Sequence, residues 1–236
     1  MPPAHVLPSP HPLDSSSATP SLQEPAESSA SQDAATATDP RDFPARPFLS
    51  TRRLRLRELC LADIPALRAL NSNPQVAAHL LEPYPTDYIG LSATILYANV
   101  CYLKRPGLGV WHASDMEGRF LGVFALMPIE GTDDVEIGTR LLPETRGRLL
   151  PIEGGRALCT HAFDTVGLSH LVGLCDPDNA PIPAILRRLG FSADGETMHF
   201  GRRALRFILQ RDTWHARSAR MQNGGSDGRE QERRHD

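Results

Sequence analysis

The stretch that decides the fold runs from residue 135 to residue 155 and reads VEIGTRLLPETRGRLLPIEGG. Apolar and polar residues alternate over 135–142, which predicts a strand. Two arginines around a glycine follow at 146–148. From residue 150 the pattern is helical, with Gly167 placed to end the helix, and its apolar face comprises Leu158, Cys159, Ala162, Phe163 and Val166. The stretch is therefore a strand, a short loop and a helix in direct succession.

A helix that begins directly after such a loop presents free backbone amides at its first turn. These amides and the helix dipole attract an anion such as a pyrophosphate. Arg146 and Arg148 add positive charge on either side of Gly147, where the missing side chain permits a close approach of the backbone. Many such joints contain a glycine and an arginine, so a plain crossover turn is an equally open interpretation.

Patterns on either side of this joint predict a mixed α+β sheet, mostly antiparallel, with helices on both faces. Three strand-like runs separated by turn residues predict an antiparallel meander over 109–113, 120–127 and 135–142. After the helix, a short buried strand at 171–174 completes one strand–helix–strand crossover. A compact helix and two closing strands, around 197–200 and 205–209, end the pattern.

The segment before the meander predicts one strand and two helices. Arginine and leucine alternate over 53–57, which is typical of a strand with one solvated face; an arginine stripe for nucleic acid is a less favoured alternative. We expect Asp63 to cap a short helix that stops before Pro74. We expect Thr86 to cap a longer helix that ends at Pro106-Gly107.

Composition divides the chain into one core and two tails. Residues 1–47 are mostly Pro, Ser, Ala, Thr and Asp, with more carboxylates than arginines, whereas acidic and basic side chains balance over 48–215. We expect 48–215 to form one domain. We expect 1–47 and 216–236 to be disordered, because they cannot bury enough apolar surface to offset their ordering entropy.

The composition also excludes several classes of protein. The chain has no run of about 18 apolar residues and no cationic leader before an apolar one, so we expect a cytoplasmic protein without a membrane partner. Nine histidines lack metal-ligand spacing, so we expect no metal, and the balanced core charge argues against nucleic acid. The oligomeric state stays open. Cysteines without CxxC spacing indicate free thiols in a reducing compartment, at Cys60, Cys101, Cys159 and Cys175.

Several short motifs are spaced along roughly 48–214. They start with STRRLRLR at 50–57 and NPQV at 73–76, continue from EIG through LPE over 136–144, and close with DPDN at 176–179 and LRRLGF at 186–191. Together they resemble the motifs of the GCN5-related N-acetyltransferases (GNAT), in particular the RimJ/RimL-like branch, which acetylates the N-termini of ribosomal proteins. Several spaced motifs that agree with the element order are more specific than any one of them.

The resemblance implies acetyl-CoA as donor and an amine as acceptor, either a protein N-terminus or a small molecule, without a metal or a covalent intermediate. It implies that a backbone amide near Leu141 or Leu142 steadies the reacting carbonyl oxygen. The other coenzyme contacts implied are Arg146, Gly147, Arg148, Leu149 and Asn179. For Asn179, an Asx turn that caps the following helix is the alternative.

The coenzyme loop departs from the family pattern. The pattern [Q/R]-x-x-G-x-[G/A] falls on Glu144, Gly147 and Leu149, so two of its three specified positions differ. Leu149 places a Cβ where the backbone of relatives meets phosphate. Gly154 and Gly155 either permit close approach to the cofactor or let the helix pack closely on the sheet.

Glu136 is the candidate general base. Strand alternation puts Glu136, Gly138 and Arg140 on one face. A carboxylate in the middle of a covered sheet lies in a cleft, where its pKa rises and it can accept an ammonium proton, or it forms an ion pair. A salt bridge with Arg140 is therefore the alternative. Leu186 stands where several relatives carry a tyrosine that protonates the departing thiolate, and we find no substitute for that acid.

The sequence thus predicts an acetyl-CoA-dependent N-acetyltransferase in which the acceptor amine, deprotonated with help from Glu136, attacks the thioester directly. The altered loop and the missing tyrosine favour a second hypothesis. In that hypothesis the chain is a non-catalytic relative that keeps the fold as a binding or interaction protein.

Overall fold

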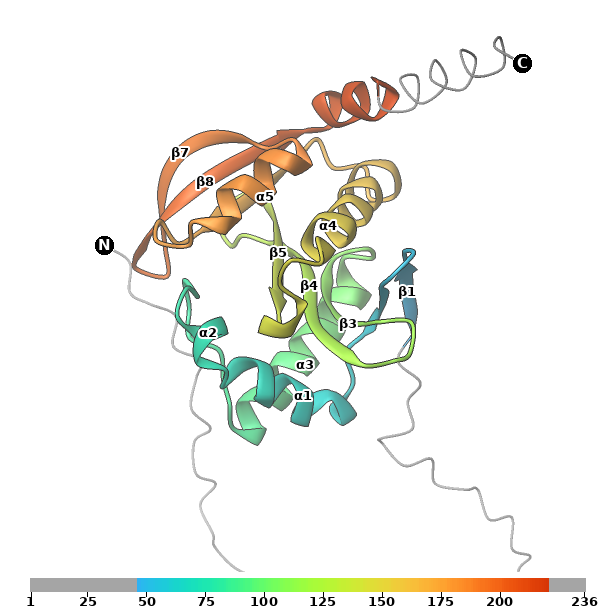
Figure 1. Ribbon diagram of the computed structural model, residues 1–236, viewed down its shortest axis with the longest axis vertical. Helices are drawn as coiled ribbons and strands as arrows, with labels where there is room; N and C mark the ends of the chain where they lie inside the picture. Colours follow the sequence, from blue (N-terminus) through green and yellow to red (C-terminus); the bar gives the residue numbers. More distant parts are fainter. Residues whose placement is uncertain (1–45, 221–236) are drawn as a thin grey trace, which may run out of the picture. The chain divides into compact units, whose positions relative to one another are not determined.

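The computed structural model describes residues 46–220, which build one eight-stranded sheet with helices on both faces (Figure 1). The expected mixed α+β class is confirmed. The strands are β1 (Pro47–Ser50), β2 (Arg55–Glu58), β3 (Gly109–Ser114), β4 (Phe120–Pro128), β5 (Val135–Leu141), β6 (His170–Cys175), β7 (Ser192–His199) and β8 (Arg202–Gln210). The helices are α1 (Ile64–Asn71), α2 (Pro74–Ala77), α3 (Tyr88–Lys104), α4 (Leu150–Thr160) and α5 (Pro181–Leu189). A further helix covers 211–220.

The strands lie in the order β1-β2-β3-β4-β5-β6-β8-β7. All neighbours are antiparallel except β5 and β6, which are parallel. Parallel neighbours need a crossover connection, and α4 provides it between these two strands. The expected meander is β3-β4-β5, and the expected crossover is β5-α4-β6.

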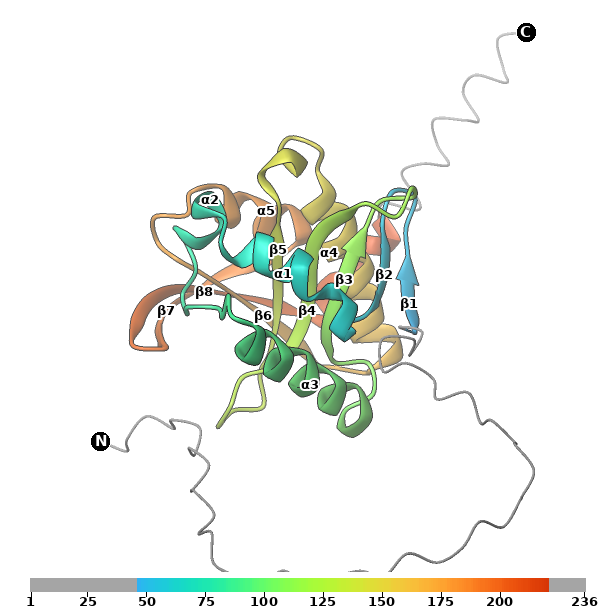
Figure 2. The ribbon, with the colours of Figure 1, turned by 90° about the horizontal axis from the view of Figure 1, so that it is seen from below.

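The sheet separates two apolar cores, because successive side chains of a strand point to opposite faces. On β4, Val123 packs in the cluster of α1 and α3, whereas Phe124 packs in the cluster of α4 and α5. Figures 1 and 2 show α1 and α3 on one face of the sheet and α4 and α5 on the other. Any residue of the central strands can therefore be assigned to one of these two faces.

Two glycines set how closely α4 approaches its neighbours. A Cβ added at Gly154 would lie 2.3 Å from Cζ of Phe124, and one at Gly155 would lie 2.8 Å from Cδ1 of Leu189. Both positions lie past the first turn of α4, which begins at Leu150. Close packing of helix and sheet is therefore the role that the structure assigns to these glycines.

Two of the expected helix caps are wrong. Helix α3 is capped by Asp87, whose carboxylate accepts a hydrogen bond from the amide of Gly90 at 2.9 Å, and not by Thr86. Asp63 precedes α1 but caps it with no side-chain bond. Its buried carboxylate accepts two hydrogen bonds from Arg57, at 2.6 and 2.8 Å. The carboxylate of Asp63 therefore binds Arg57 of β2 instead of capping α1.

Both ends of the domain also differ from expectation. The strand expected at 53–57 is β2, and it starts at Arg55 rather than Arg53. Strand β1, which was not expected, precedes it and pairs with it. At the other end, residues 216–220, expected in a disordered tail, continue the helix that starts after β8. That helix is anchored by Trp214, which packs against Phe163. Pro47, expected in the disordered N-terminal tail, is the first residue of β1. Residues 1–45 and 221–236 of the two expected tails lie outside the described residues.

Replacing Gly154 by alanine should destabilise the domain. The new methyl group would meet the Phe124 ring, and moving the ring or the helix should cost about 1–3 kcal/mol, more than the gain of up to about 1 kcal/mol in helix propensity. Urea unfolding measures the difference. Arg156→Ala, at an exposed position of the same helix, is the control and should stay within about 0.5 kcal/mol of wild type. Equal stability of Gly154→Ala and wild type would contradict the close packing.

Candidate active site

Strands β5 and β6 separate in the middle of the sheet. They pair only at Glu136 and Val172, so among the described residues 137–141 of β5 have no ladder partner in β6. On the other side β4 pairs with the whole of β5, and β8 pairs with the whole of β6. Each central strand thus keeps one complete ladder, and an opening lies between the two strands.

The strand register identifies the amide that faces this opening. Leu142 donates its N–H to the carbonyl oxygen of Leu121 on the β4 side at 2.9 Å. Amides of a strand alternate in direction, so the N–H of Leu141 points away from β4 and towards β6. Of the two amides expected to steady a carbonyl oxygen, that of Leu142 is engaged, and Leu141 carries the available one.

The loop from β5 to α4 holds two residues in the left-handed conformation. Gly147 has φ +75°, which glycine adopts without strain. Leu149, the residue before α4, has φ +56°, and a side chain there costs roughly 1–2 kcal/mol. This backbone conformation is a physical reason for the small residue that the family pattern has at this position. The loop keeps that conformation with a leucine whose side chain is 50% exposed.

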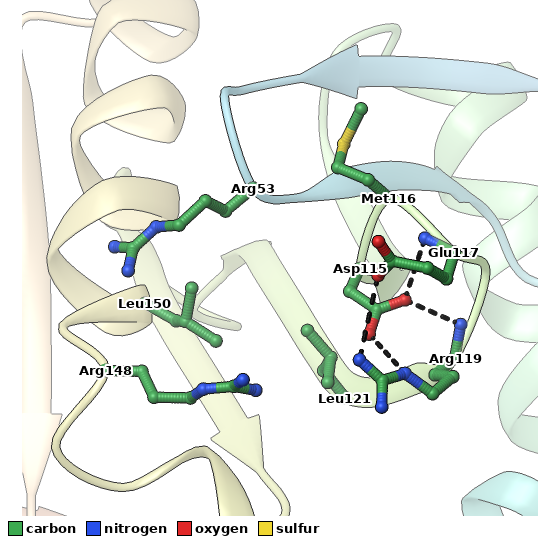
Figure 3. Close-up of a pocket in the computed structure, with 8 residues that line it drawn as sticks. All are labelled: Arg53, Asp115, Met116, Glu117, Arg119, Leu121, Arg148 and Leu150. Atoms are coloured by element: carbon green, nitrogen blue, oxygen red, sulfur yellow. Dashed lines mark hydrogen bonds and ion pairs between the residues drawn. The ribbon is translucent and has the colours of Figure 1, made fainter.

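A cavity of about 240 Å³ lies beside this loop. Figure 3 shows that its walls come from the β1–β2 turn, the β3–β4 hairpin and the start of α4. The residues that line it are Arg53, Asp115, Met116, Glu117, Arg119, Leu121, Arg148 and Leu150. The cavity thus combines an apolar floor with three guanidinium groups.

Two of these guanidinium groups are already paired. Arg119 Nε lies 2.7 Å from Asp115 Oδ2, and Arg53 Nε lies 2.6 Å from Glu153 Oε2 on α4. Arg148 forms no ion pair with any residue of the described part of the chain. Its guanidinium is therefore the group available to an anion at the start of α4.

Glu136 lies at the inner end of the opening, partly buried, on the sheet face that α1 and α3 cover. Its carboxylate has no hydrogen bond or ion pair to another residue in the range 46–220. Burial, with a smaller contribution from the negative charge of Glu82, raises the pKa of Glu136 to about 7. A carboxylate with a pKa near neutrality is suited to accept a proton from an amine.

The salt bridge considered between Glu136 and Arg140 is not formed. Arg140 donates from Nη1 to Oδ1 of Asn71 at 2.8 Å, and its guanidinium carbon lies 3.4 Å from the centre of the Tyr84 ring. Burial lowers the pKa of Arg140, opposed by Tyr84 and Glu82. The end of α1 and the α2–α3 loop thus hold Arg140 away from Glu136, which leaves the carboxylate uncompensated.

A second contact, made by Arg202, also involves the α2–α3 loop. Arg202, at the start of β8, donates to the carbonyl oxygen of Leu80 and, at 2.7 Å, to Oδ2 of Asp176. It thereby ties the α2–α3 loop to the β7–β8 hairpin. Burial lowers the pKa of His199 in that hairpin, and the nearby carboxylate of Glu82 opposes the shift. Arg202 therefore connects the α2–α3 loop, the β7–β8 hairpin and the end of β6, and we call these three segments the rim.

No motif in the sequence marks the residues of this rim. Glu82, Tyr84, His199 and Arg202 come from segments without a motif, and their partners lie far along the chain. The one local signal is the pair of prolines on either side of Tyr84, which stiffens the loop that carries the ring.

Asn179 follows β6, and its alternative role as a helix cap is wrong. The turn is closed by Asp176, whose carboxylate accepts from the amide of Asp178 at 2.8 Å, and α5 starts after Ala180 without a side-chain cap. Within 46–220 the side-chain amide of Asn179 has no hydrogen-bond partner, so it is available to a ligand. Leu186 is buried, and its position supplies no acid.

The family is shown by the comparison with known domains. Residues 53–192 match the model of the acetyltransferase (GNAT) domain, more than half of the chain. The chain therefore belongs to the GNAT family of acetyltransferases, as the motifs implied.

Individual relatives agree with this assignment. The FsC-acetyl coenzyme A-N(2)-transacetylase of Aspergillus fumigatus is 27% identical over 157 residues, which is 63% of this chain and 66% of the relative. An acetyltransferase from Agrobacterium tumefaciens has a TM-score of 0.61 at 25% identity, covering 71% of this chain and 96% of that one. RimL, a ribosomal alpha-N-protein acetyltransferase in complex with coenzyme A, has a TM-score of 0.60 at 19% identity, over 70% and 98% of the two chains, and shares the fold.

Three further observations concern metal ligands, membrane-spanning helices and cysteines. Over 46–220 no three His, Cys, Asp or Glu side chains are grouped so that they could hold a metal ion. No helix in that range is long and apolar enough to cross a membrane. The four cysteines are free thiols, partly buried at Cys60 and buried at Cys101, Cys159 and Cys175.

The raised pKa of Glu136 predicts a pH-dependent stability. Folding raises this pKa from 4.5 to about 7, so between these values the folded chain binds more protons, and its free energy of unfolding falls as pH rises. Glu136→Gln does not titrate. Between pH 5 and 8 it should therefore gain up to about 3 kcal/mol relative to wild type. Urea unfolding across this range gives the difference.

The matched control for this measurement is Glu144→Gln, which alters an exposed carboxylate in the next loop. Its stability curve should run parallel to that of wild type. Parallel curves for Glu136→Gln as well would show that Glu136 keeps an ordinary pKa in the folded chain.

Proposed function

We propose that this protein is an acetyl-CoA-dependent N-acetyltransferase that acts on a primary amine, with Glu136 as the general base. The observation that carries the proposal is the environment of Glu136. Its carboxylate is uncompensated, has a pKa raised to about 7, and lies where β5 and β6 separate. A structural carboxylate in a covered sheet would be expected to have an ion-pair or hydrogen-bond partner.

Acetyl-CoA fits the residues on the other side of the opening. The free amide of Leu141 suits a carbonyl oxygen. The start of α4 offers the amide of Leu150 and the helix dipole to a pyrophosphate, while Pro151 has no N–H and Ile152 donates to Leu149. The loop 146–149 and Arg148 would hold phosphate, and Asn179 would meet the coenzyme from the β6 side. Acetyl-CoA would supply the activated thioester when bound.

The roles of the chain's own groups follow from their positions. Glu136 accepts a proton from the acceptor ammonium, directly or through one water, and so supplies the neutral amine that can attack a carbonyl carbon. The amide of Leu141 donates a hydrogen bond where negative charge develops on the carbonyl oxygen. The two loops joined by Arg202 limit the motion of the acceptor, which favours an attack geometry. No metal is required for these steps.

The acceptor is a protein N-terminus or a small amine. The negative charges of Glu82 and Glu136 on the acceptor side suit a cationic amine. The Aspergillus relative is named as an N(2)-transacetylase, which agrees with transfer of the acetyl group to a nitrogen.

A non-catalytic binding protein is the second candidate. It is favoured by Leu149, whose side chain stands at the start of α4, and by Leu186, which supplies no acid for a departing thiolate. An enzyme must bind acetyl-CoA, which we expect near the loop 146–149, whereas a binding protein with this altered loop need not. The two candidates also differ in whether Glu136 acts in turnover.

Glu136→Gln should lower turnover by roughly 10²–10⁴-fold while acetyl-CoA affinity stays unchanged, because the amide keeps the shape but cannot accept a proton. The loss should shrink as pH rises, since more of the acceptor amine is then already neutral. Release of free coenzyme A thiol with a panel of amines and N-terminal peptides measures turnover, and calorimetry measures affinity. Glu130→Gln, at an exposed position of the β4–β5 loop, is the control and should keep the wild-type rate.

A Glu136→Gln protein with the wild-type rate at every pH would remove the catalytic assignment. Wild-type protein that binds acetyl-CoA but acetylates none of the amines would favour the non-catalytic candidate.

Arg148→Ala should weaken acetyl-CoA binding by about 10- to 100-fold, the usual loss for one hydrogen bond to a charged group. Arg156→Ala removes a positive charge from an exposed position of α4 and should bind like wild type. Titration calorimetry at constant salt gives both affinities. Equal losses in the two variants would mean that only the general field of positive charge matters.

A further inference from the structure

Helix α3 has two apolar faces, and the sheet covers only one of them. Leu91, Ile95 and Ala98 are buried in the core. Six of the ten exposed large apolar side chains among the described residues lie on this helix, so they form a patch. Their exposed fractions are Tyr88 59%, Ile89 80%, Leu96 59%, Tyr97 59%, Val100 44% and Leu103 76%. Figure 2 shows α3 at the outside of its layer.

The outer face has the spacing of a seam between two helices. Ile89, Ala93, Leu96, Val100 and Leu103 follow one another at steps of four, three, four and three residues. This is the spacing of the core positions in a coiled coil, and all five are exposed. We call these five residues the outer stripe. The helix carries no charged side chain from its first residue to the end of the outer stripe.

The outer stripe is nearly symmetric about Leu96. Large side chains stand at both ends, Ile89 and Leu103, and smaller ones stand between, Ala93 and Val100. A second copy that runs in the opposite direction would therefore match side-chain sizes along the whole stripe. A twofold axis near Leu96 generates such a pair, with the same patch on both copies.

The charges that flank the outer stripe select the same arrangement. Asp87 stands just before the helix, and Lys104 and Arg105 stand at its end; all three are exposed. In an antiparallel pair, Asp87 of each copy lies beside Lys104 and Arg105 of the other copy, so opposite charges meet at both ends. In a parallel pair, like charges would meet. Because Asp87 is acidic and the stripe lacks cations, the face is poorly suited to an anionic membrane.

We propose that the outer stripe is a homodimer interface, in which two α3 helices pack antiparallel about a twofold axis near Leu96. The apolar centre supplies the buried contact, and the Asp87–Arg105 and Asp87–Lys104 pairs set the direction. The interface lies on the outside of α3, so dimerisation leaves the opening between β5 and β6 free. This inference is independent of the proposed catalytic role.

Sedimentation equilibrium of the full chain between about 1 and 100 µM tests the interface. Wild type should be a dimer in this range. Leu96→Glu places two carboxylates at the axis and should weaken dimerisation by at least about 30-fold. Met198→Glu is the matched control, since Met198 on β7 is 66% exposed, and it should stay dimeric. Circular dichroism confirms that both variants fold.

Cross-linking tests the direction of the helices. With the axis near Leu96, the two copies of this residue lie about as far apart as paired helices, roughly 8–10 Å. The two copies of Ile89 lie about 20 Å apart along the helices. A bismaleimide reagent that spans about 8–10 Å should therefore join Leu96→Cys chains but not Ile89→Cys chains. The wild-type protein, treated in the same way, shows how much cross-linking its own thiols give.

Three results would overturn the proposal. The first is a monomeric wild type at about 100 µM, and the second is a dimer that Leu96→Glu leaves intact. The third is a monomer that sediments with phosphatidylcholine vesicles through α3, since the stripe would then belong to a membrane surface.

Discussion

The single pair of residues that joins β5 to β6 is the constraint on which the site depends. After Glu136 and Val172 the two strands separate, because each keeps a complete ladder on its far side, β5 with β4 and β6 with β8. The edge of β5 then presents amides in the middle of the sheet without a ladder partner in β6, among them that of Leu141. Buried amides without acceptors are costly. A ligand carbonyl or water is the physically expected partner.

In the proposed mechanism, the role of Glu136 depends on keeping its carboxylate apart from the guanidinium of Arg140. A guanidinium beside Glu136 would lower the pKa of the carboxyl and stabilise its charged form. Asn71 and the ring of Tyr84 hold Arg140 instead, so burial acts on Glu136 without compensation and raises its pKa. The same contacts fix the α2–α3 loop over the sheet. One set of interactions therefore positions the loop and leaves the carboxylate unpaired.

The departures from the family pattern differ in their physical consequences. Leu149 adopts the left-handed conformation just before α4, at the cost of strain that a glycine would avoid. Leu186 has no such equivalent, because a buried aliphatic side chain cannot donate a proton. Gly154 and Gly155 lie outside the loop and belong to the packing of α4. The proposed coenzyme loop therefore carries a strained leucine, and the position of Leu186 supplies no acid.

The sequence by itself determined what depends on neighbours along the chain. Periodicity and turn residues predicted the order of the elements from β2 to β8, apart from α2, and the crossover. Alternation placed Glu136 and Arg140 on one face. Local patterns could not choose between Thr86 and Asp87 as a cap, since both side chains can reach a helix start. Tertiary structure alone decided the rest. The free amide follows from the register of β4 on β5, and the partners of Arg140 come from α1 and a loop far away in sequence. The reason is that packing brings together side chains whose separation along the chain leaves no local signal.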